Sequence, residues 1–133
     1  MIEDFLLSVI AHVDNPKLFA NTTVKIGSLD ATGKAIAVRM IPSGRGERYF
    51  EGSTKKVNFQ FLTKSKNQLE AINGLEKITD KLSDVRNDGI PSLTGKFALL
   101  SCDIYTTLNM VEKTNSNEYI YTALFTAELE GGD

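Results

Sequence analysis

Two side chains of this 133-residue chain are the first candidates for a nucleophile and a general base: its one cysteine, Cys102, and its one histidine, His12. Nucleophilic catalysis needs such a group beside a base that a third group orients. No serine lies in a nucleophile-elbow pattern that would recruit His12. Cys102 falls between Leu100 and Ile104 in a β-prone run, which favours a buried, inert thiol. His12 stands near the end of a helical stretch, where a positive partial charge suits the helix C-terminus. The spacing therefore predicts no catalytic residue.

Metal and phosphate sites are equally unsupported by the sequence. One histidine and one cysteine would need several carboxylates to complete a metal site, and no carboxylates have that spacing. Gly44-Arg45-Gly46 begins like a dinucleotide fingerprint, but Tyr49 stands where its third glycine belongs, and a β-prone run follows instead of a helix. Asp80 and Asp84 lie one helical turn apart among lysines, as on a solvated helix face. We expect no metal, no cofactor and no enzyme activity.

The segment from Pro42 to Ser53 carries a different chemistry. Its glycines and its proline oppose a regular element, because glycine tolerates positive φ and proline lacks a backbone donor. Arginines and aromatic rings are the residue types that anchor protein interfaces. The alternative for the two aromatic residues is that they begin the next strand and pack into the core. The segment predicts a protein interface made by Arg45, Glu47, Arg48, Tyr49 and Phe50.

Length and composition indicate what kind of protein this chain is. The length fits one domain, residues 1–133, with a core of its own. Fifteen basic and 17 acidic residues give a net charge of −2, whereas proteins that bind nucleic acid tightly carry a positive surplus. No apolar run approaches the ~20 residues of a membrane helix. Glu3 and Asp4 occupy the place of the basic region of a signal peptide, and the single cysteine fits a reducing compartment, the cytoplasm.

Two helices are expected from the spacing of apolar residues. The first has one apolar face and ends at Asp14-Asn15-Pro16, because the residue before a proline avoids the α region. Its apolar face is Ile2, Phe5, Leu6, Val9, Ile10 and Val13. The second follows Ser65-Lys66-Asn67-Gln68, which matches the S-x-x-Q capping box. Gly74 within it suggests close packing onto a sheet. Its apolar residues are Leu69, Ile72, Leu75, Ile78 or Thr79, Leu82 and Val85.

Two β-prone runs lie before the interface segment, and one lies after it. Thr22 to Leu29 and Ala35 to Ile41 flank Asp30-Ala31-Thr32-Gly33, which has the Asp-first, Gly-fourth pattern of a type I turn. We expect these two runs to form a hairpin. Val57 to Thr63 alternates apolar and polar residues, as a half-buried strand does.

The C-terminal third is also β-prone. Phe97 to Thr106 is strand-like, and Tyr119 to Leu129 is the longest strand candidate, with rings and alkyl groups on one face. Asn115-Ser116-Asn117 is the turn that joins the latter to Val111-Glu112-Lys113. Helix, strands, helix, strands, without regular βαβ alternation, predicts an α+β fold: a mainly antiparallel twisted sheet with two helices packed on one face.

The order of several segments resembles a known family. Ile41 to Ser53 has the form I-P-S-G-x-G-E-R-Y-x-x-G-S and precedes the strand Val57-Asn58-Phe59-Gln60-Phe61. A helix comes next, then Tyr105 to Lys113, and last Tyr119 to Leu129. This order resembles the small minor capsid protein family of Gram-positive long-tailed phages and their prophages, whose members are thought to act as tail terminators. The resemblance extends from the first helix to Leu129, with the segment from Phe19 to Gly33 the least well matched.

The resemblance implies a structural virion protein that caps the tail tube as a hexameric ring at the head-proximal end of the tail. One ring face would meet the tail tube protein, and the other a head-completion or connector protein. Assembly would take place in the host cytoplasm, with no specific nucleic acid sequence and no membrane as partner. Three alternatives remain: a head-tail connector (stopper or adaptor) or other minor virion protein, a host-directed binding module, and a small enzyme that uses Cys102 or His12.

Overall fold

The computed structural model describes residues 2–14, 24–29, 33–41, 54–86, 89–95 and 97–130. Within them the chain forms two helices and six strands. In chain order these are α1 (Ile2–Val13), β1 (Val24–Ile26), β2 (Ala35–Ile41), β3 (Thr54–Ser65), α2 (Gln68–Leu82), β4 (Val85–Arg86), β5 (Ala98–Lys113) and β6 (Tyr119–Glu130).

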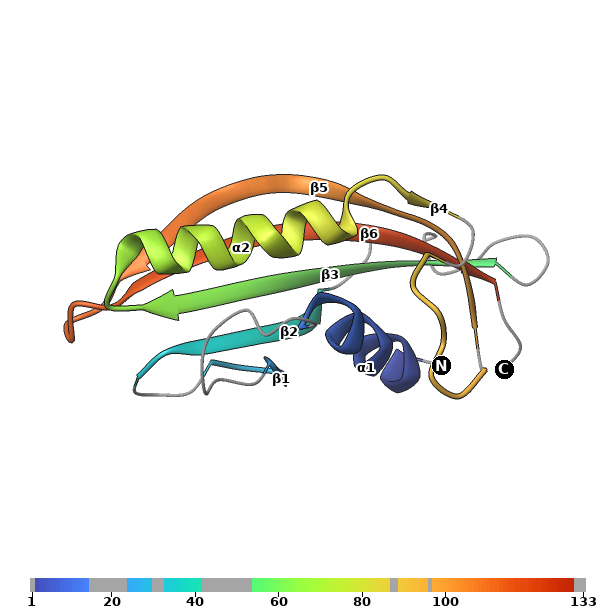
Figure 1. Cartoon of the computed structure of the whole chain (residues 1–133), viewed down its shortest axis with the longest axis horizontal. Coiled ribbons are helices and arrows are strands. Elements are labelled where there is room, and N and C mark those ends of the chain that lie inside the picture. The colour runs from blue at the N-terminus through green and yellow to red at the C-terminus, as the bar shows by residue number, and fades with distance from the viewer. Residues whose placement is uncertain are drawn as a thin grey trace.

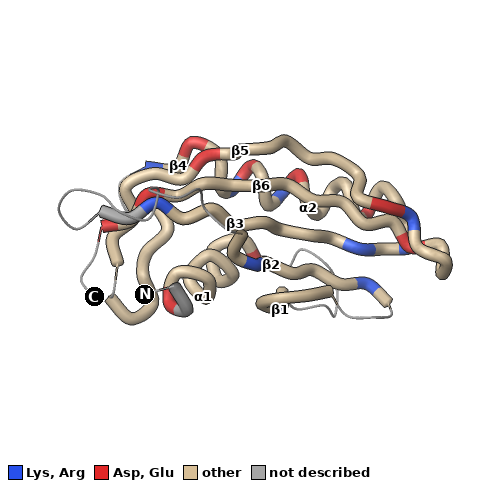
Figure 2. The backbone as a smooth tube through the Cα atoms, turned by 180° about the vertical axis from the view of Figure 1, so that it is seen from behind, with Lys and Arg blue, Asp and Glu red and all other residues tan. Residues whose placement is uncertain are grey.

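The six strands form one sheet in the order β1-β2-β3-β6-β5-β4. Every neighbouring pair is antiparallel except β1 with β2. Both helices lie in front of the sheet in Figure 1, α2 along the long strands and α1 beside β2. In Figure 2, which shows the molecule from behind, α2 lies behind the strands. The expected α+β fold, a mainly antiparallel sheet with two helices on one face, is confirmed.

The central strands are β3 and β6, which pair over their whole length, from Thr54 with Glu130 to Ser65 with Tyr119. Their alternating residues face the helices, as the period of a strand requires. Phe59 is the centre of a ring cluster, with its centroid 5.3 Å from that of Phe5 on α1 and 5.5 Å from that of Phe125 on β6. All three rings are fully buried. The core therefore forms where α1 and α2 cover the middle of the sheet.

Helix α1 has the bounds that its apolar face and Asn15-Pro16 predicted. Helix α2 begins later than the proposed capping box, because its N-cap is Asn67, whose side chain accepts from the backbone N–H of Glu70 at 3.2 Å. Ser65 still contributes, since its hydroxyl donates to the Glu70 carboxylate at 2.7 Å. At the other end α2 stops at Leu82, so Val85 lies in β4 instead of in the helix.

The apolar face of α2 is also narrower than its sequence suggested. Leu69 is 68% exposed, whereas Leu75, Ile78 and Leu82 are fully buried. Gly74 is buried on the face that packs against the sheet, as expected. Leu69 is the second residue of the helix, which explains why an apolar side chain at the right spacing still lies in solvent.

The expected hairpin of the first two strands is wrong. β1 runs parallel to β2, with Val24 opposite Ile36 and Ile26 opposite Val38. Gly27 and Gly33, at the two ends of the connection, both have left-handed φ, 111° and 80°. A positive φ at each glycine allows the chain to change direction at both ends of the connection. A hairpin would instead reverse the chain in a single turn. β-propensity identified the strands, but it does not contain their relative direction, because either direction can pair on a strand edge.

The C-terminal hairpin follows its expectation. β5 is a single strand up to Lys113, longer than the predicted run, and β6 begins at Tyr119. Between them Thr114 N–H donates to the carbonyl of Glu118 at 2.8 Å, and Asn117 has a left-handed φ of 61°. Asparagine tolerates that conformation, which is why it marked the turn in the sequence.

Candidate functional site

The predicted interface residues, Arg45, Glu47, Arg48, Tyr49 and Phe50, lie outside the described residues. What the structure gives is the position of the two strands that the segment joins. β2 ends at Ile41 and β3 begins at Thr54, and these strands are antiparallel neighbours, with Ile41 opposite Asn58. The segment therefore starts and ends at the same end of the sheet.

The thiol of Cys102 is placed as predicted, on β5 and fully buried. Burial raises its pKa to about 12, with the nearby Asp103 carboxylate adding to the shift and Arg86 opposing it. A thiol with that pKa is protonated at neutral pH, and the thiolate is the reactive form. Cys102 is therefore a core residue without nucleophilic reactivity.

His12 connects the C-terminal ends of the two helices. Its Nε2 donates to the backbone carbonyl of Lys81 in the last turn of α2 at 3.1 Å, and Lys81 Nζ donates to the carbonyl of Val13 at 3.4 Å. The last carbonyls of a helix lack partners inside the helix, and positive groups suit that end of the dipole. Each helix thus supplies a donor to the end of the other, so His12 has a structural role.

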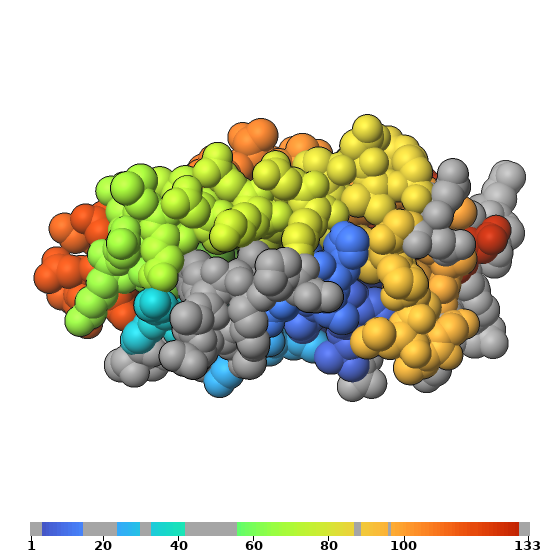
Figure 3. Space-filling view, viewed as in Figure 1, coloured from blue at the N-terminus to red at the C-terminus, as the bar shows by residue number. Residues whose placement is uncertain are grey.

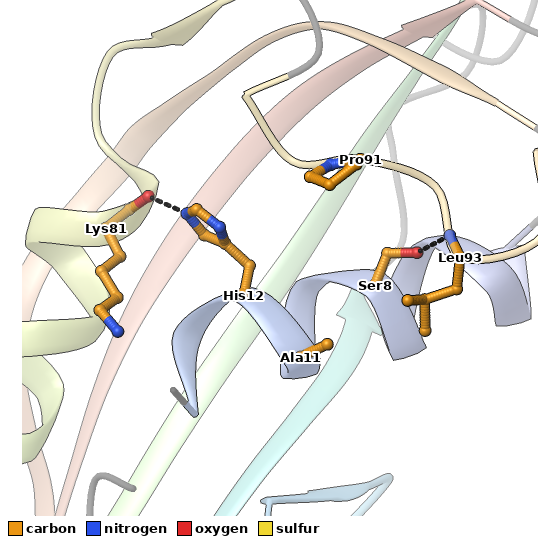
Figure 4. Close-up of a pocket in the computed structure, with 6 residues that line it drawn as sticks. All are labelled: Ser8, Ala11, His12, Lys81, Pro91 and Leu93. Atoms are coloured by element: carbon orange, nitrogen blue, oxygen red, sulfur yellow. Dashed lines mark hydrogen bonds between the residues drawn. The ribbon is translucent and has the colours of Figure 1, made fainter. Parts of the chain in front are cut away.

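Figure 4 shows the surface hollow beside this contact. It measures about 460 Å³ and is lined by Ser8, Ala11, His12, Lys81, Pro91 and Leu93. Ser8 Oγ accepts from the backbone N–H of Leu93 at 3.0 Å, so it is engaged with the loop and not with His12. No carboxylate is among these described lining residues. His12 is paired with the Lys81 carbonyl, and no lining carboxylate orients it toward the Ser8 hydroxyl, so these residues do not form a nucleophile–base pair.

A loop is clamped onto the N-terminal half of α1. Asp4 accepts from the backbone N–H of Thr94 at 3.1 Å and from the hydroxyl of Ser92. The clamp holds Leu93 outward, where it is 60% exposed, beside α1, on which Leu7 is 43% exposed. In the space-filling view of Figure 3 this loop lies against α1 and the end of α2. The arrangement is a rigid surface with apolar side chains, which suits contact with a protein better than chemistry.

Polar side chains cross the sheet on the face away from the helices. Arg39 Nε donates to Gln60 at 2.7 Å, Gln60 donates to Thr122 at 2.8 Å, and Thr122 donates to the carbonyl of Phe61 at 2.9 Å. These contacts link β2, β3 and β6 side by side. They stiffen the sheet without presenting an unpaired reactive group.

A buried ion pair ties the end of the sheet. Lys64 Nζ lies 3.7 Å from Glu118, and both side chains are only 4% exposed. The Glu118 carboxylate also accepts from the backbone N–H of Gly33 at 2.9 Å. Glu118 belongs to the β5–β6 turn, so this pair anchors the tip of that hairpin to β3 and to the loop before β2.

Among the described residues no cluster of three or more His, Cys, Asp or Glu side chains is arranged to hold a metal ion, and no helix is long and apolar enough to cross a membrane. In the described part of the chain, the most prominent features are the exposed apolar side chains beside α1 and a sheet stiffened by hydrogen bonds between its strands.

Comparison with known proteins decides the family. A family model described as bacteriophage tail terminator protein matches residues 13–130. This chain belongs to the bacteriophage tail terminator family. It is therefore a structural protein of the phage tail and part of the virion. The family resemblance noted from the sequence, in the order of its segments from Ile41 to Leu129, is thereby confirmed.

A structure comparison shows a similar fold in a chain of another particle. A chain from a structure titled virion of native gene transfer agent particle superposes with a TM-score of 0.56 at 14% identity, over 92% of this chain and 84% of the other. No curated protein sequence matches this tail terminator family member. At that identity the structural match shows the fold alone.

Sequence reasoning missed the exposed apolar residues of β5 in this tail terminator family member. Tyr105, Met110 and Val111 are 65%, 51% and 47% exposed, although they stand in a β-prone run. One signal was present: Asn109-Met110-Val111-Glu112 breaks the alternation that a half-buried strand shows.

Proposed function

We propose that this protein is a non-enzymatic tail terminator that caps the tail tube and forms the surface to which the head joins. The observation that carries the proposal is the family match over residues 13–130. The buried, protonated thiol of Cys102 and the structural role of His12 support a protein without a reactive centre. The chain is proposed to act as one domain, residues 1–133.

The proposed assembly is a hexameric ring at the head-proximal end of the tail. One face contacts the tail tube protein, and the other a head-completion or connector protein. A ring made by rotation uses two different patches on each subunit, a heterologous interface that closes at a fixed copy number. The net charge of −2 fits a channel through which DNA passes without adhering, because carboxylates repel phosphate. Assembly takes place in the host cytoplasm, without a specific nucleic acid sequence or a membrane as partner.

Electron microscopy of the purified protein, alone and with polymerising tail tube protein, tests this function. Six-fold rings that stop tube growth at their point of attachment are the expected result. A protein that binds the portal side of a head but leaves tube growth unchanged would be a connector instead, the second candidate among virion proteins. A strict monomer with no effect on tubes would contradict both.

The segment from Pro42 to Ser53 is proposed to be part of an assembly interface, through Arg45, Glu47, Arg48, Tyr49 and Phe50. Support comes from its composition, because arginine and tyrosine anchors at an interface typically lose about 2 kcal/mol or more on truncation. That is roughly a thirtyfold loss of affinity at each joint. We expect Arg48→Glu to abolish capping while the circular-dichroism spectrum and the melting temperature stay near those of the wild type. Normal tail length with this variant would remove the segment from the interface.

A further inference from the structure

One edge of the sheet is open over most of a long strand. β4 pairs with β5 only at Ser101 and Cys102, and no described strand pairs with the outer side of β5 from Asp103 to Lys113. The free backbone N–H and C=O groups of such an edge are a template for a further strand. Tyr105, Met110 and Val111 on this stretch are about half exposed or more. β5 therefore offers both backbone hydrogen bonds and apolar side chains along one open edge.

A groove follows this edge where α2 crosses β5. It measures about 240 Å³, and its apolar part comes from Ile72 on α2 and from Ile104 and Leu108 on β5. The carboxylates of Glu76 and Asp80 stand at its rim, and both residues are exposed. Figure 2 shows acidic residues around β4, the start of β5 and α2, with basic residues among them. The groove on the open edge is thus apolar with an acidic rim.

The described part of the opposite edge of the sheet is basic. β1 pairs with β2 on one side, and no described strand pairs with its other side. Four consecutive residues from Lys25 to Ser28 are exposed, with Ile26 at 47%. The charged residues of the described parts of this edge are all basic: Lys25, Lys34 and Arg39. This edge is a short strand with one apolar and several cationic side chains.

We propose that the β1–β2 edge of a second copy of this chain docks along the β5–α2 edge. The neighbour's β1 lies beside the open backbone of β5, with its Lys25 on the groove side, facing Glu76 and Asp80, and its Ile26 on the opposite face, as the period of a strand requires. The inference rests on the proposed ring, for which it supplies the joint between subunits. Charge selects this occupant: two such grooves facing each other would bring Glu76 and Asp80 of both copies together, which costs affinity, whereas the acidic groove and the basic β1–β2 edge attract.

The geometry also meets the requirement for a ring. The two edges lie at opposite ends of the strand order β1-β2-β3-β6-β5-β4, so every subunit has one of each. Contacts of this kind are heterologous and repeat from copy to copy until the ring closes. The buried Lys64–Glu118 pair holds the tip of the β5–β6 hairpin in place, so the open edge is presented by a rigid strand.

A charge exchange tests the joint. Asp80→Lys and Lys25→Glu should each weaken subunit association at least about tenfold, because each places like charges together at every joint. The double variant should recover most of the lost association. The matched controls are Glu130→Lys and Lys66→Glu, which make the corresponding charge reversals at exposed positions outside the groove and outside β1 and β2. Association is measured by analytical ultracentrifugation, with melting temperatures to show that each variant folds.

Disulfide trapping gives an independent result. Ile26→Cys combined with Tyr105→Cys or with Val111→Cys should give a ladder of covalent oligomers under mild oxidation. The native Cys102 does not interfere, because it is buried and its pKa is raised to about 12. The single variants should stay monomeric on a non-reducing gel. Dimers formed by Val111→Cys alone would show β5 paired with β5 around a two-fold axis and would overturn the proposal.

The outcomes separate this inference from the function on which it rests. Rings that cap tubes normally in Asp80→Lys and Lys25→Glu, with no trapped ladder from either cysteine pair, would overturn the joint and leave the tail terminator function standing. Wild-type protein that forms no rings and stops no tube would overturn the function and the joint together. Recovery in the double variant, with a trapped ladder, supports both.

Discussion

The two halves of β5 differ although they belong to one strand. The inner half, Ala98 to Cys102, pairs with β6 and reaches β4 at its end, and Leu99 and Cys102 are almost completely buried under the helices. The outer half, Asp103 to Lys113, pairs with β6 on one side only among the described strands, and Tyr105 and Met110 are exposed. Similar residue types thus stabilise the fold in one half and remain available for a partner in the other.

Register irregularities accompany the change. Pairing between β5 and β6 shifts between Leu99 and Ser101, and again at three places from Ile104 to Glu112. Bulges of this kind are common at sheet edges and re-aim side chains. They explain why Met110 and Val111, consecutive in sequence, are both exposed. Three of the four shifts fall in the outer half, and one falls in the inner half.

The largest expected loss of folding stability comes from breaking the Lys64–Glu118 ion pair, which anchors the outer half of β5. Lys64→Met leaves the Glu118 carboxylate buried at the hairpin tip without its cation, which should cost about 3–5 kcal/mol. The exposed pair Arg86–Asp103, with side chains 49% and 42% exposed, is the contrast: Asp103→Asn should cost about 0–1 kcal/mol. Urea denaturation of both variants gives the two free energies. Equal losses would mean that burial does not distinguish the two pairs.

Apolar truncation compares the halves directly. Leu99→Ala should cost about 2–5 kcal/mol, because it leaves a cavity in a close-packed core. Met110→Ala should change the free energy of unfolding by no more than about 0.5 kcal/mol, as expected of exposed positions. Subunit association should be weakened more by Met110→Ala than by Leu99→Ala. A large stability loss in Met110→Ala would show that the outer half belongs to the core.

Replacing the thiol of Cys102, which lies at the boundary of the two halves, should lower the free energy of unfolding by a smaller amount. Cys102→Ser places a hydroxyl where a buried thiol stood, and an unsatisfied buried hydroxyl costs about 1–3 kcal/mol. Tail capping should be unchanged, since Cys102 has no reactive role, and His12→Ala should likewise leave capping intact. Loss of infectivity in either variant, with folding and assembly intact, would revive the enzyme alternative.

The smallest expected effect is a pH dependence at the N-terminus of α2. The hydrogen bond from Ser65 lowers the pKa of the Glu70 carboxyl from its ordinary value of 4.5, partial burial opposes the shift, and Lys34 reinforces it. A depressed pKa contributes stability above pH 4.5 that is lost as the pH falls through the lower, folded-state value. The stability difference between wild type and Glu70→Gln should therefore shrink with acidification below pH 4.5. A difference that stays constant in this range would show that the ionised form of Glu70 contributes nothing.

The sequence predicted much of the fold, because local signals agreed with the tertiary outcome. The apolar face and the Asn15-Pro16 stop defined α1, alternation defined β3 and β6, and the Asn-Ser-Asn turn placed the last hairpin. The inert character of Cys102 and the helix-end role of His12 followed from position alone. The predicted interface from Arg45 to Phe50 lies outside the described residues and stays a prediction.

Other features depended on contacts between residues far apart in sequence. β1 pairs in the parallel direction with the edge of β2 that β3 leaves free, and no turn signal in the sequence contains that direction. The Lys64–Glu118 pair joins residues that no local pattern connects.

By itself the sequence determined most of the segments and their type, because these depend on residue type and short-range spacing. The tertiary structure decided the strand order, the parallel edge pair and the open length of β5. Strand pairing is set by long-range burial, and a residue in a β-prone run becomes core or surface only when its neighbours in the sheet and the helices above it are in place.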